Sequence, residues 1–385
     1  MSTRPARLNP ATKRVLRFVV VVGVVNLFAD LTYEGGRGIV GAYLGHLGAS
    51  GALIGAAAGA GELIGYAVRS VSGAFADRTG RYWVTVWVGY AINMLCVPAL
   101  ALAGNWPLAA GLMIGERLGR GIRKPVMSAM LAEAGRELGG GGRVFGFNQM
   151  LDQFGATIGP LVVAYAVLHG GYRSGFGVLI VPAILTLATL SIAAVAGRNV
   201  VPPLEDESAP PVRDWAAFRR YAIGGALLAA GFVDFALIAF RFQRDNIAGV
   251  AAISVLFAVA MGVSAVASPI LGWLFDRAGK PVIVAAVAIA SLAAPLAFLG
   301  SGAWATAGAA LWGVGIAVED ALLLALVATI IVKRRKAAIF GLYDLIFGVA
   351  WFAGSTVAGV LLDRSTVALA IFSTLLQLAA IPFFI

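Results

Sequence analysis

Ionisable residues lie inside long apolar stretches of this sequence, where a charge is costly. Asp30, Glu34 and Arg37 follow one another at spacings of four and three residues, so a helix would place all three on one face. Asp234 and Arg241 repeat the seven-residue spacing between Asp30 and Arg37 later in the chain. A carboxylate held away from water can load and release a proton, so this pattern predicts a proton or substrate pathway.

Other apolar stretches contain polar residues in the same setting. Glu116 and Arg117 are adjacent, and their charged stripe continues with Arg120 and with Arg123 or Lys124. Glu319 and Asp320 are also adjacent, so they point about 100° apart on a helix and at most one can face a cavity squarely. The remaining candidates are Asn148, Asp152 and Asp344. The alternative is a self-neutralising structural cluster, but the recurrence of the Asp–Arg pair favours a pathway.

The elements that position these residues follow from the composition. Of 385 residues, 60% are hydrophobic and only 12% are charged, whereas a soluble domain carries roughly 25% charged residues. So few polar groups could not cover a soluble globule, which leaves an integral membrane protein. The apolar runs lack the period-2 alternation of a β-barrel, so the predicted spans are helices.

About twelve helices fit the chain, because a span needs about 20 apolar residues and each helix with its turn takes roughly 30. Breaks at glycine, proline and charged residues place the spans at 15–45, 51–74, 83–104, 107–131, 143–168, 174–197, 218–243, 248–272, 281–300, 304–331, 338–362 and 366–385. The polar stretch 198–217 is too short for a domain. It predicts a linker between six-helix bundles at 15–197 and 218–385, which follow a tail at 1–14.

Cations in the loops predict the orientation. Arginine and lysine gather in alternate loops, including the run Lys333-Arg334-Arg335-Lys336, which places both termini on the cytoplasmic side of the cell (inner) membrane. The formal net charge of +10 is then explained by topology, and nucleic-acid binding is not expected. The single cysteine, Cys96, cannot form an internal disulfide.

A nine-residue pattern occurs twice, at the turns after the second and eighth spans. Both copies read G-x-x-x-D-R-x-G-[RK] and lie 199 residues apart. The first copy contains Gly73, Asp77, Arg78, Gly80 and Arg81, and the second contains Gly272, Asp276, Arg277, Gly279 and Lys280. We expect Asp77 to pair with cations at the ends of neighbouring helices and to stabilise an outward-open state. The repeat predicts two related halves.

These features resemble the major facilitator superfamily over essentially the whole chain. The two loop copies are similar to its signature, and Arg117-Leu-Gly-Arg120-Gly121 resembles its R-x-x-Q-G motif with Arg120 in place of Gln. Gly146, Gly155, Gly159 and Pro160 resemble the glycine-proline motif of antiporter-type exporters, although Val163-Ala164 replaces a glycine pair. The resemblance implies an all-α fold of two pseudo-symmetric six-helix bundles that rock about a central site, with Arg117 in proton transfer.

The chemistry that the sequence lacks narrows the function. No P-loop and no nucleophile–base arrangement is present, and the glycines around Glu62 predict a helix-packing ladder. His46 and His169 are far apart, so no metal site, cofactor or enzymatic activity is expected. We predict a monomeric secondary transporter in the lipid bilayer that moves a small-molecule substrate by alternating access, coupled to protons and directed to export.

Three alternatives stay open at this point. The first is uptake of an anionic or zwitterionic nutrient, with Arg37, Arg117 or Arg241 as the anion site. The second is export of a divalent metal through Asp and Asn oxygens. The third is a membrane receptor on the same fold, which the absence of a soluble sensing domain disfavours.

Overall fold

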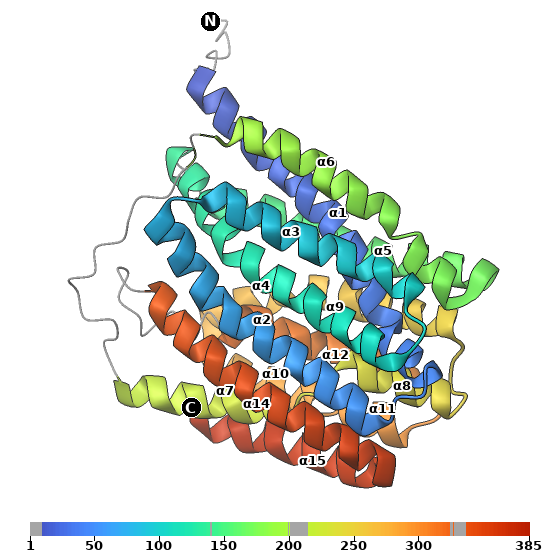
Figure 1. Cartoon of the computed structure of the whole chain (residues 1–385). Coiled ribbons are helices and arrows are strands. Elements are labelled where there is room, and N and C mark those ends of the chain that lie inside the picture. Colours follow the sequence, from blue (N-terminus) through green and yellow to red (C-terminus); the bar gives the residue numbers. More distant parts are fainter. Residues whose placement is uncertain (1–9, 139–140, 199, 201–214, 324–325, 327–335) are drawn as a thin grey trace, which may run out of the picture.

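A computed structural model describes residues 10–138, 141–198, 200, 215–323, 326 and 336–385, and within these ranges the chain is helical without any strand (Figure 1). The first helices are α1 (Pro10–His46), α2 (Gly51–Thr79), α3 (Tyr82–Ala99), α4 (Trp106–Glu137), α5 (Gly141–Gly177) and α6 (Ile180–Ala196). The others are α7 (Trp215–Gly231), α8 (Phe235–Arg244), α9 (Val250–Ala278), α10 (Pro281–Ala290), α11 (Ala293–Leu299), α12 (Ala303–Ala317), α14 (Lys336–Arg364) and α15 (Thr366–Ala380). A π-helical turn, η2 (Val318–Leu323), follows α12.

A helix lies at every predicted span, so the all-α membrane fold is confirmed. Nine stretches of the described residues are long and apolar enough to cross a membrane. One of them, residues 144–196, covers two predicted spans that meet where Gly170 and Gly171 leave the helical conformation. Two further predicted spans correspond to the shorter apolar helix α12 and to α4, which is rich in charged residues. The tenth predicted span, 304–331, continues beyond the described residues.

The element boundaries differ from the prediction at several places. α2, α4 and α9 extend to Thr79, Glu137 and Ala278, and the predicted ninth span is divided into α10 and α11. α1 begins at Pro10, so the last residues of the predicted tail are helical. α7 begins at Trp215, inside the predicted linker, whose residues 199 and 201–214 lie outside the described ranges, as does most of the Lys333–Lys336 run.

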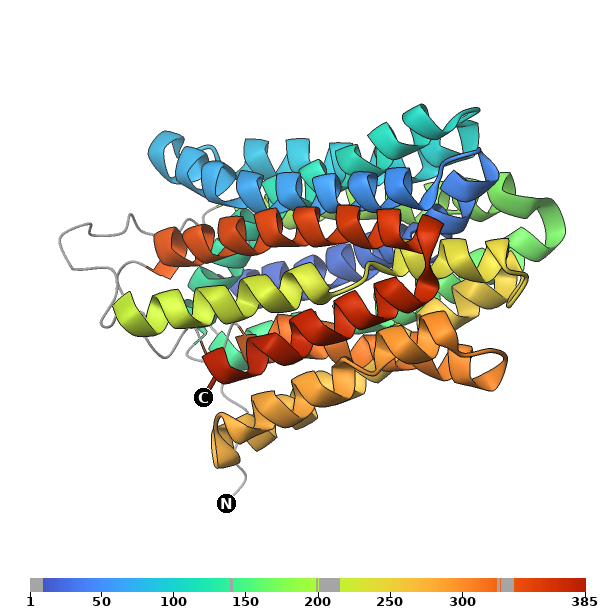
Figure 2. The same cartoon turned by 90° about the horizontal axis from the view of Figure 1, so that it is seen from below.

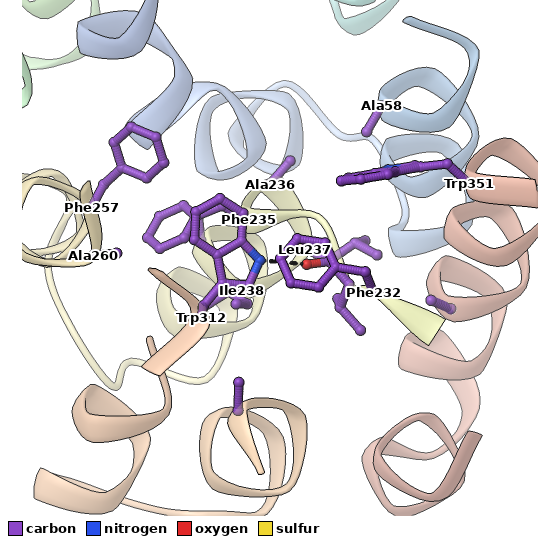
Figure 3. Close-up of a cluster of buried hydrophobic side chains, with 14 of the residues drawn as sticks. Ala58, Phe232, Phe235, Ala236, Leu237, Ile238, Phe257, Ala260, Trp312 and Trp351 are labelled. Atoms are coloured by element: carbon purple, nitrogen blue, oxygen red, sulfur yellow. Dashed lines mark hydrogen bonds between the residues drawn. The ribbon is translucent and has the colours of Figure 1, made fainter. Parts of the chain in front are cut away.

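The predicted seventh span is not one helix. α7 ends at Gly231 and α8 begins at Phe235, with Asp234 as the N-cap of α8 in an extended conformation. The freed carbonyl of Gly231 accepts hydrogen bonds from Ser373 Oγ at 2.6 Å and Gln377 Nε2 at 3.2 Å. The carbonyl of Val233 accepts a hydrogen bond from Trp312 Nε1 at 2.8 Å, which is the dashed line at Trp312 in Figure 3. These bonds satisfy the broken backbone inside the protein, as a membrane interior requires.

The helix contacts are of two kinds. Some lie within the N-terminal helices (α1–α6) or within the C-terminal helices (α7–α15), and the others join the two sets. α1 packs on α5 and α6, and α2 and α3 pack on α4, whereas α7 packs on α14 and α15 and α9 packs on α12. The two sets meet where α2 lies along α14, α5 along α9, and α1 along α8 (Figures 1 and 2).

Glycines permit these close approaches, as the sequence predicted for α2. A Cβ atom on Gly55 would lie 2.2 Å from the Ser355 carbonyl oxygen of α14, and one on Gly65 would lie 3.4 Å from that of Arg117 in α4. The glycine-rich stretch of α2 is therefore a packing ladder between two helices. On α1, a Cβ on Gly41 would lie 1.9 Å from the Ala236 carbonyl oxygen of α8.

The two ends of the helix bundle are distinguishable. α1 begins and α15 ends at the same end, which we call the terminus side (Figure 2). We call the other end the far side, which carries the turns between α1 and α2 and between α14 and α15. On the far side, the Asp363 carboxylate accepts hydrogen bonds from the backbone amides of Gly51 and Ala52, both at 2.8 Å. This carboxylate of α14 thus binds the N-terminus of α2 and joins the two sets of helices.

Candidate functional site

Six charged side chains of α1, α2 and α4 form one buried group, which we call the central charge cluster. Its members are Glu34, Arg37, Glu62, Glu116, Arg117 and Arg120. Their side chains are between 5% and 12% exposed. Three carboxylates and three guanidinium groups therefore neutralise one another away from water.

Glu62 is the centre of this cluster. Its Oε1 atom lies 3.1 Å from Arg117 Nε, 3.4 Å from Arg120 Nη2 and 3.8 Å from Arg37 Nη2. Two of these arginines lie on α4 and one on α1, so a single carboxylate oxygen of α2 links three helices. The aliphatic part of the Arg117 side chain packs directly on Gly61, where a Cβ would lie 3.0 Å from Arg117 Cγ. The glycines beside Glu62 thus allow the arginine to reach it.

The other two carboxylates of the cluster each have their own arginine partners. Glu34 Oε1 lies 3.5 Å from Arg37 Nη1, one helical turn away on α1. Glu116 Oε2 lies 3.3 Å from Arg117 Nη1, and its Oε1 accepts a hydrogen bond from Asn93 Nδ2 at 3.0 Å. Asn93 is fully buried and also binds the Glu116 carbonyl, so α3 fixes this carboxylate in place.

Asp234 brings the C-terminal helices to the cluster. Its Oδ1 atom accepts the Ala236 amide at 2.9 Å, while its buried Oδ2 atom has no hydrogen-bond partner in the described part of the chain. The residue is 2% exposed and lies within electrostatic range of Arg37. The Arg37 guanidinium stands 5.7 Å from the ring centre of Trp312. The helix break thus leaves a buried carboxylate of the C-terminal helices within electrostatic range of an arginine of the N-terminal helices.

A second group of charges lies within the N-terminal helices, between α1, α4 and α5. Asp30 is within electrostatic range of Asp152, Arg123 and Lys124. Arg123 binds Asn93 Oδ1 at 3.2 Å and stacks 4.3 Å from the Tyr90 ring centre. Nearby, Asn26 lies 3.5 Å from Asn148 Oδ1 and accepts the Tyr90 hydroxyl. The polar candidates Asn148 and Asp152 on α5 thus lie beside the candidate Asp30 on α1.

Two more carboxylates of the C-terminal helices face α2. Asp344 Oδ2 lies 3.5 Å from Arg69 Nη1, and Glu319 Oε1 accepts the Tyr66 hydroxyl at 2.6 Å. Arg69 in turn stands 4.4 Å from the Tyr66 ring centre. Glu319 lies on the π-helical turn η2, whereas the side chain of its neighbour Asp320 is outside the described set.

The structure places the candidate Arg241 away from the cluster. The seven-residue spacing of Asp234 and Arg241 predicts a shared helical face, and this prediction is wrong because Asp234 precedes α8. Arg241 instead binds the carbonyls of Ala297 and Gly300 at the end of α11 and pairs with Asp245 at 3.2 Å. It is a positive group at a helix C-terminus.

The loop signatures and the helix-five motif have structural positions of their own. Asp77 accepts the Tyr82 hydroxyl at 2.9 Å and has no ion pair in the ranges described, so the expected pairing with cations is not observed in this conformation. Gly80 and Gly279 have positive φ values of 65° and 68° at the turns. The other signature positions, Gly73, Arg78, Arg81, Gly272, Asp276, Arg277 and Lys280, lie at the same end of α2 and α9.

The helix-five glycines are packing positions. A Cβ on Gly155 would lie 2.3 Å from the Leu27 carbonyl oxygen, and one on Gly159 would lie 2.4 Å from that of Leu31. Gly146 faces open space, and the Pro160 carbonyl accepts the Ser254 hydroxyl of α9 at 2.7 Å. The motif therefore holds α5 against α1 and continues the contact to α9.

The sequence alone did not indicate that Glu62, Arg69 and Tyr66 belong to the site. The glycines around Glu62 predicted only a packing ladder, because the three arginines that meet Glu62 are distant in the chain. The signal was present in part: an acidic residue among glycines lies where two helices approach closely enough for long side chains to converge. In the ranges described, no group of three His, Cys, Asp or Glu side chains could hold a metal ion.

Comparison with known proteins decides the family. A sequence profile of the Major Facilitator Superfamily matches residues 24–355. The chain belongs to the major facilitator superfamily. As a member of this superfamily it is a multi-pass membrane transporter of a small molecule and not an enzyme. Uncharacterized proteins of Mycobacterium bovis and Mycobacterium tuberculosis are each 33% identical over 377 residues, which cover 95% of this chain and 91% of theirs.

Solved transporters share the fold of this superfamily member. A POT peptide transporter in complex with sulfate has a TM-score of 0.76 at 15% identity, covering 95% of this chain and 92% of that one. The nucleoside transporter NupG has a TM-score of 0.72 at 13% identity, covering 96% and 100%. An inward-facing bacterial homolog of the lysosomal transporter Spinster has a TM-score of 0.68 at 14% identity, covering 98% and 95%. At these identities the likeness establishes the fold alone.

Proposed function

We propose that the protein is a proton-coupled secondary transporter in which the bundles 15–197 and 218–385 rock about the central charge cluster. The observation that carries the proposal is Asp234, a buried carboxylate with one oxygen that has no hydrogen bond in the described part of the chain, which lies within electrostatic range of Arg37 in the other set of helices. A buried charge of this kind is costly unless it is exchanged for a proton or a ligand. Because the two groups belong to different sets, their interaction changes when the sets move apart.

We propose export in exchange for protons, in the inner membrane with both termini cytoplasmic. The direction is supported by the glycine-proline motif of α5, and the orientation by the positions of the loop cations. The pathway residues of this proposal are Asp30, Glu34, Asp152, Asp234, Glu319 and Asp344, and Arg117 is the cation that exchanges with them.

The test uses purified protein in proteoliposomes with a solute found by thermal-shift screening. An imposed pH gradient should drive movement of that solute, and both Asp30→Asn and Asp234→Asn should abolish the gradient dependence. Glu137→Gln, at the exposed end of α4, is the matched control and should leave transport unchanged. Full coupling in both Asp30→Asn and Asp234→Asn would refute the carboxylate assignment.

Uptake of an anion is a second candidate, and the convergence of Arg37, Arg117 and Arg120 favours it. The same proteoliposomes separate the two directions. Export by exchange requires solute and protons to move in opposite directions, whereas anion uptake requires them to move together. A pH electrode outside the vesicles records which occurs when the solute is added.

A further inference from the structure

We propose that Glu62 is an internal ligand in an oxyanion-binding site formed by Arg37, Arg117 and Arg120, and that a carboxylate or phosphate group of the substrate takes its place. The proposal rests on the transport function and deepens its second candidate, because it assigns the substrate class and the residues that bind it.

The geometry of the three arginines supports a binding site. Their guanidinium groups come from two helices and converge on one oxygen atom, Glu62 Oε1, within 3.8 Å. Two or three guanidinium groups around one oxyanion are the usual arrangement for carboxylate and phosphate recognition in proteins. Bringing three such groups together without a counter-ion would be strongly unfavourable in a membrane interior. The Glu62 carboxylate supplies that counter-ion.

Donor groups remain available at the site. Arg37 Nε is buried and has no hydrogen-bond partner among the residues described, and Arg117 Nη1 has only its ion pair with Glu116 Oε2 at 3.3 Å. A carboxylate of Glu62 reaching from α2 therefore does not use all the donors that the arginines present. An incoming oxyanion with two or three oxygens could satisfy more of them.

The charges around the arginines define the class of ligand. Glu34 and Glu116 remain paired with the arginines when Glu62 is displaced. Glu34 Oε1 lies 3.5 Å from Arg37 Nη1, and Glu116 Oε2 lies 3.3 Å from Arg117 Nη1. Asn93 also fixes Glu116, whereas no hydrogen bond from a neutral group to Glu62 occurs in the described ranges. With Glu62 displaced, three arginines face these two carboxylates, which leaves one positive charge for one negative group. Asp234 lies beyond Arg37 on the C-terminal helices and belongs to the moving partner.

The experiment is chemical rescue in detergent with Glu62→Ala. Loss of Glu62 leaves the arginines undercompensated, so the melting temperature should fall. Acetate, formate or inorganic phosphate should then restore it by about 3 °C or more at concentrations well above the dissociation constant. Sodium chloride at equal ionic strength is the anion control. Glu133→Ala removes the partner of the exposed Arg136 on the same α4 and should show no rescue.

A double variant links the rescue to the arginines. Arg117→Met in the Glu62→Ala background should reduce the acetate-induced shift at least threefold. Equal stabilisation by chloride, equal rescue of Glu133→Ala, or no rescue at all would each overturn the proposal. If Glu62→Ala does not accumulate, recovery of folded protein when it is purified in acetate supports the site, and failure under both conditions counts against it.

These outcomes are independent of proton coupling. Rescue reports anion binding at equilibrium, whereas the proteoliposome test reports gradient-driven movement. Absence of rescue with intact pH-driven transport would refute the oxyanion site and leave the proposed function standing. Rescue without any pH dependence of transport would support the oxyanion site and refute the proposed proton coupling.

Discussion

The N-terminal and C-terminal helices bury their charges in different ways. α1, α2 and α4 supply all members of the central charge cluster, in which every arginine contacts carboxylates of its own set of helices. Acids of the C-terminal helices instead interact with the N-terminal helices. Asp344 pairs with Arg69, Glu319 accepts the Tyr66 hydroxyl, and Asp234 lies within electrostatic range of Arg37. Aromatic rings pack beside the helix break at Asp234, where Phe232 and Phe235 both contact Trp312 (Figure 3). One set holds a balanced network, and the other presents acids that would separate from it in the rocking motion that we propose.

A pair of related sequence positions makes the contrast concrete. Arg37 and Arg241 each follow an aspartate by seven residues, yet α1 runs straight through Asp30 whereas the backbone breaks at Asp234. Arg37 therefore reaches the cluster, and Arg241 caps the end of α11. A repeated spacing fixes a shared face only when the helix between the two residues is continuous.

The largest effect is expected at the contact between α1 and α8. Gly41→Ala would place a Cβ atom 1.9 Å from the Ala236 carbonyl oxygen, so the state in which the helices touch should lose about 2–3 kcal/mol. Spin-label distances across the far side should lengthen. Gly159→Ala, which clashes within the N-terminal helices, should lower the melting temperature without changing those distances. Equal distance changes in both variants would remove the distinction between the two kinds of contact.

The two matched arginines should then respond differently. Arg241→Met leaves two carbonyls and Asp245 without their donor and should cost about 1.5–3 kcal/mol of stability, with transport by the folded fraction unchanged. Arg37→Met should reduce transport at least tenfold, because it removes the group that Asp234 faces. Melting curves and proteoliposome rates measure both. A transport defect in Arg241→Met equal to that of Arg37→Met would contradict the separate roles.

A smaller effect is expected on the far side. Asp363→Asn removes the negative charge at the N-terminus of α2, which is worth about 1 kcal/mol and corresponds to roughly a fivefold shift in population. Accessibility of an introduced cysteine at the turn between α1 and α2 should rise accordingly. Glu137→Gln, at the exposed end of α4, provides the control on the terminus side. No change in accessibility would show that this bond does not hold the two sets together.

The smallest effect concerns Asp77, which makes one hydrogen bond to Tyr82 here. Asp77→Ala and Tyr82→Phe should each cost about 0.5–1 kcal/mol of stability, since both remove the same bond. Spin-label distances across the bundle then measure the populations of the inward-open and outward-open states in each variant. A population shift in Asp77→Ala alone would support the expected cation pairing in the outward-open state, whereas identical behaviour of the two variants would refute it.

The sequence predicted the fold because apolar runs of the right length permit only helices, and their breaks are marked by glycine, proline and charge. It also predicted that Asp30, Glu34, Arg37, Glu116 and Arg117 lie inside the bundle, since charges retained in such runs need partners there. Spacing along one helix was enough for the Glu34–Arg37 pair at 3.5 Å.

The partners between helices could not be predicted in the same way. Glu62 meets Arg117 and Arg37 only because α2 packs against α4 and reaches α1, and helix rotation decides which faces meet. The break at Asp234 was equally hidden, because its apolar sequence contains no proline and the stabilising donors Ser373, Gln377 and Trp312 are distant in the chain.

In the mechanism that we propose, Asp234 couples its own protonation to the relative position of the two sets of helices. Pulsed electron–electron double resonance between spin labels on the far-side ends of α1 and α8 tests this coupling without a known substrate. The distances are measured over a pH series in lipid nanodiscs. Wild-type protein should change its distance distribution with pH, and Asp234→Asn should keep one distribution throughout. An unchanged pH response in Asp234→Asn would contradict the claim.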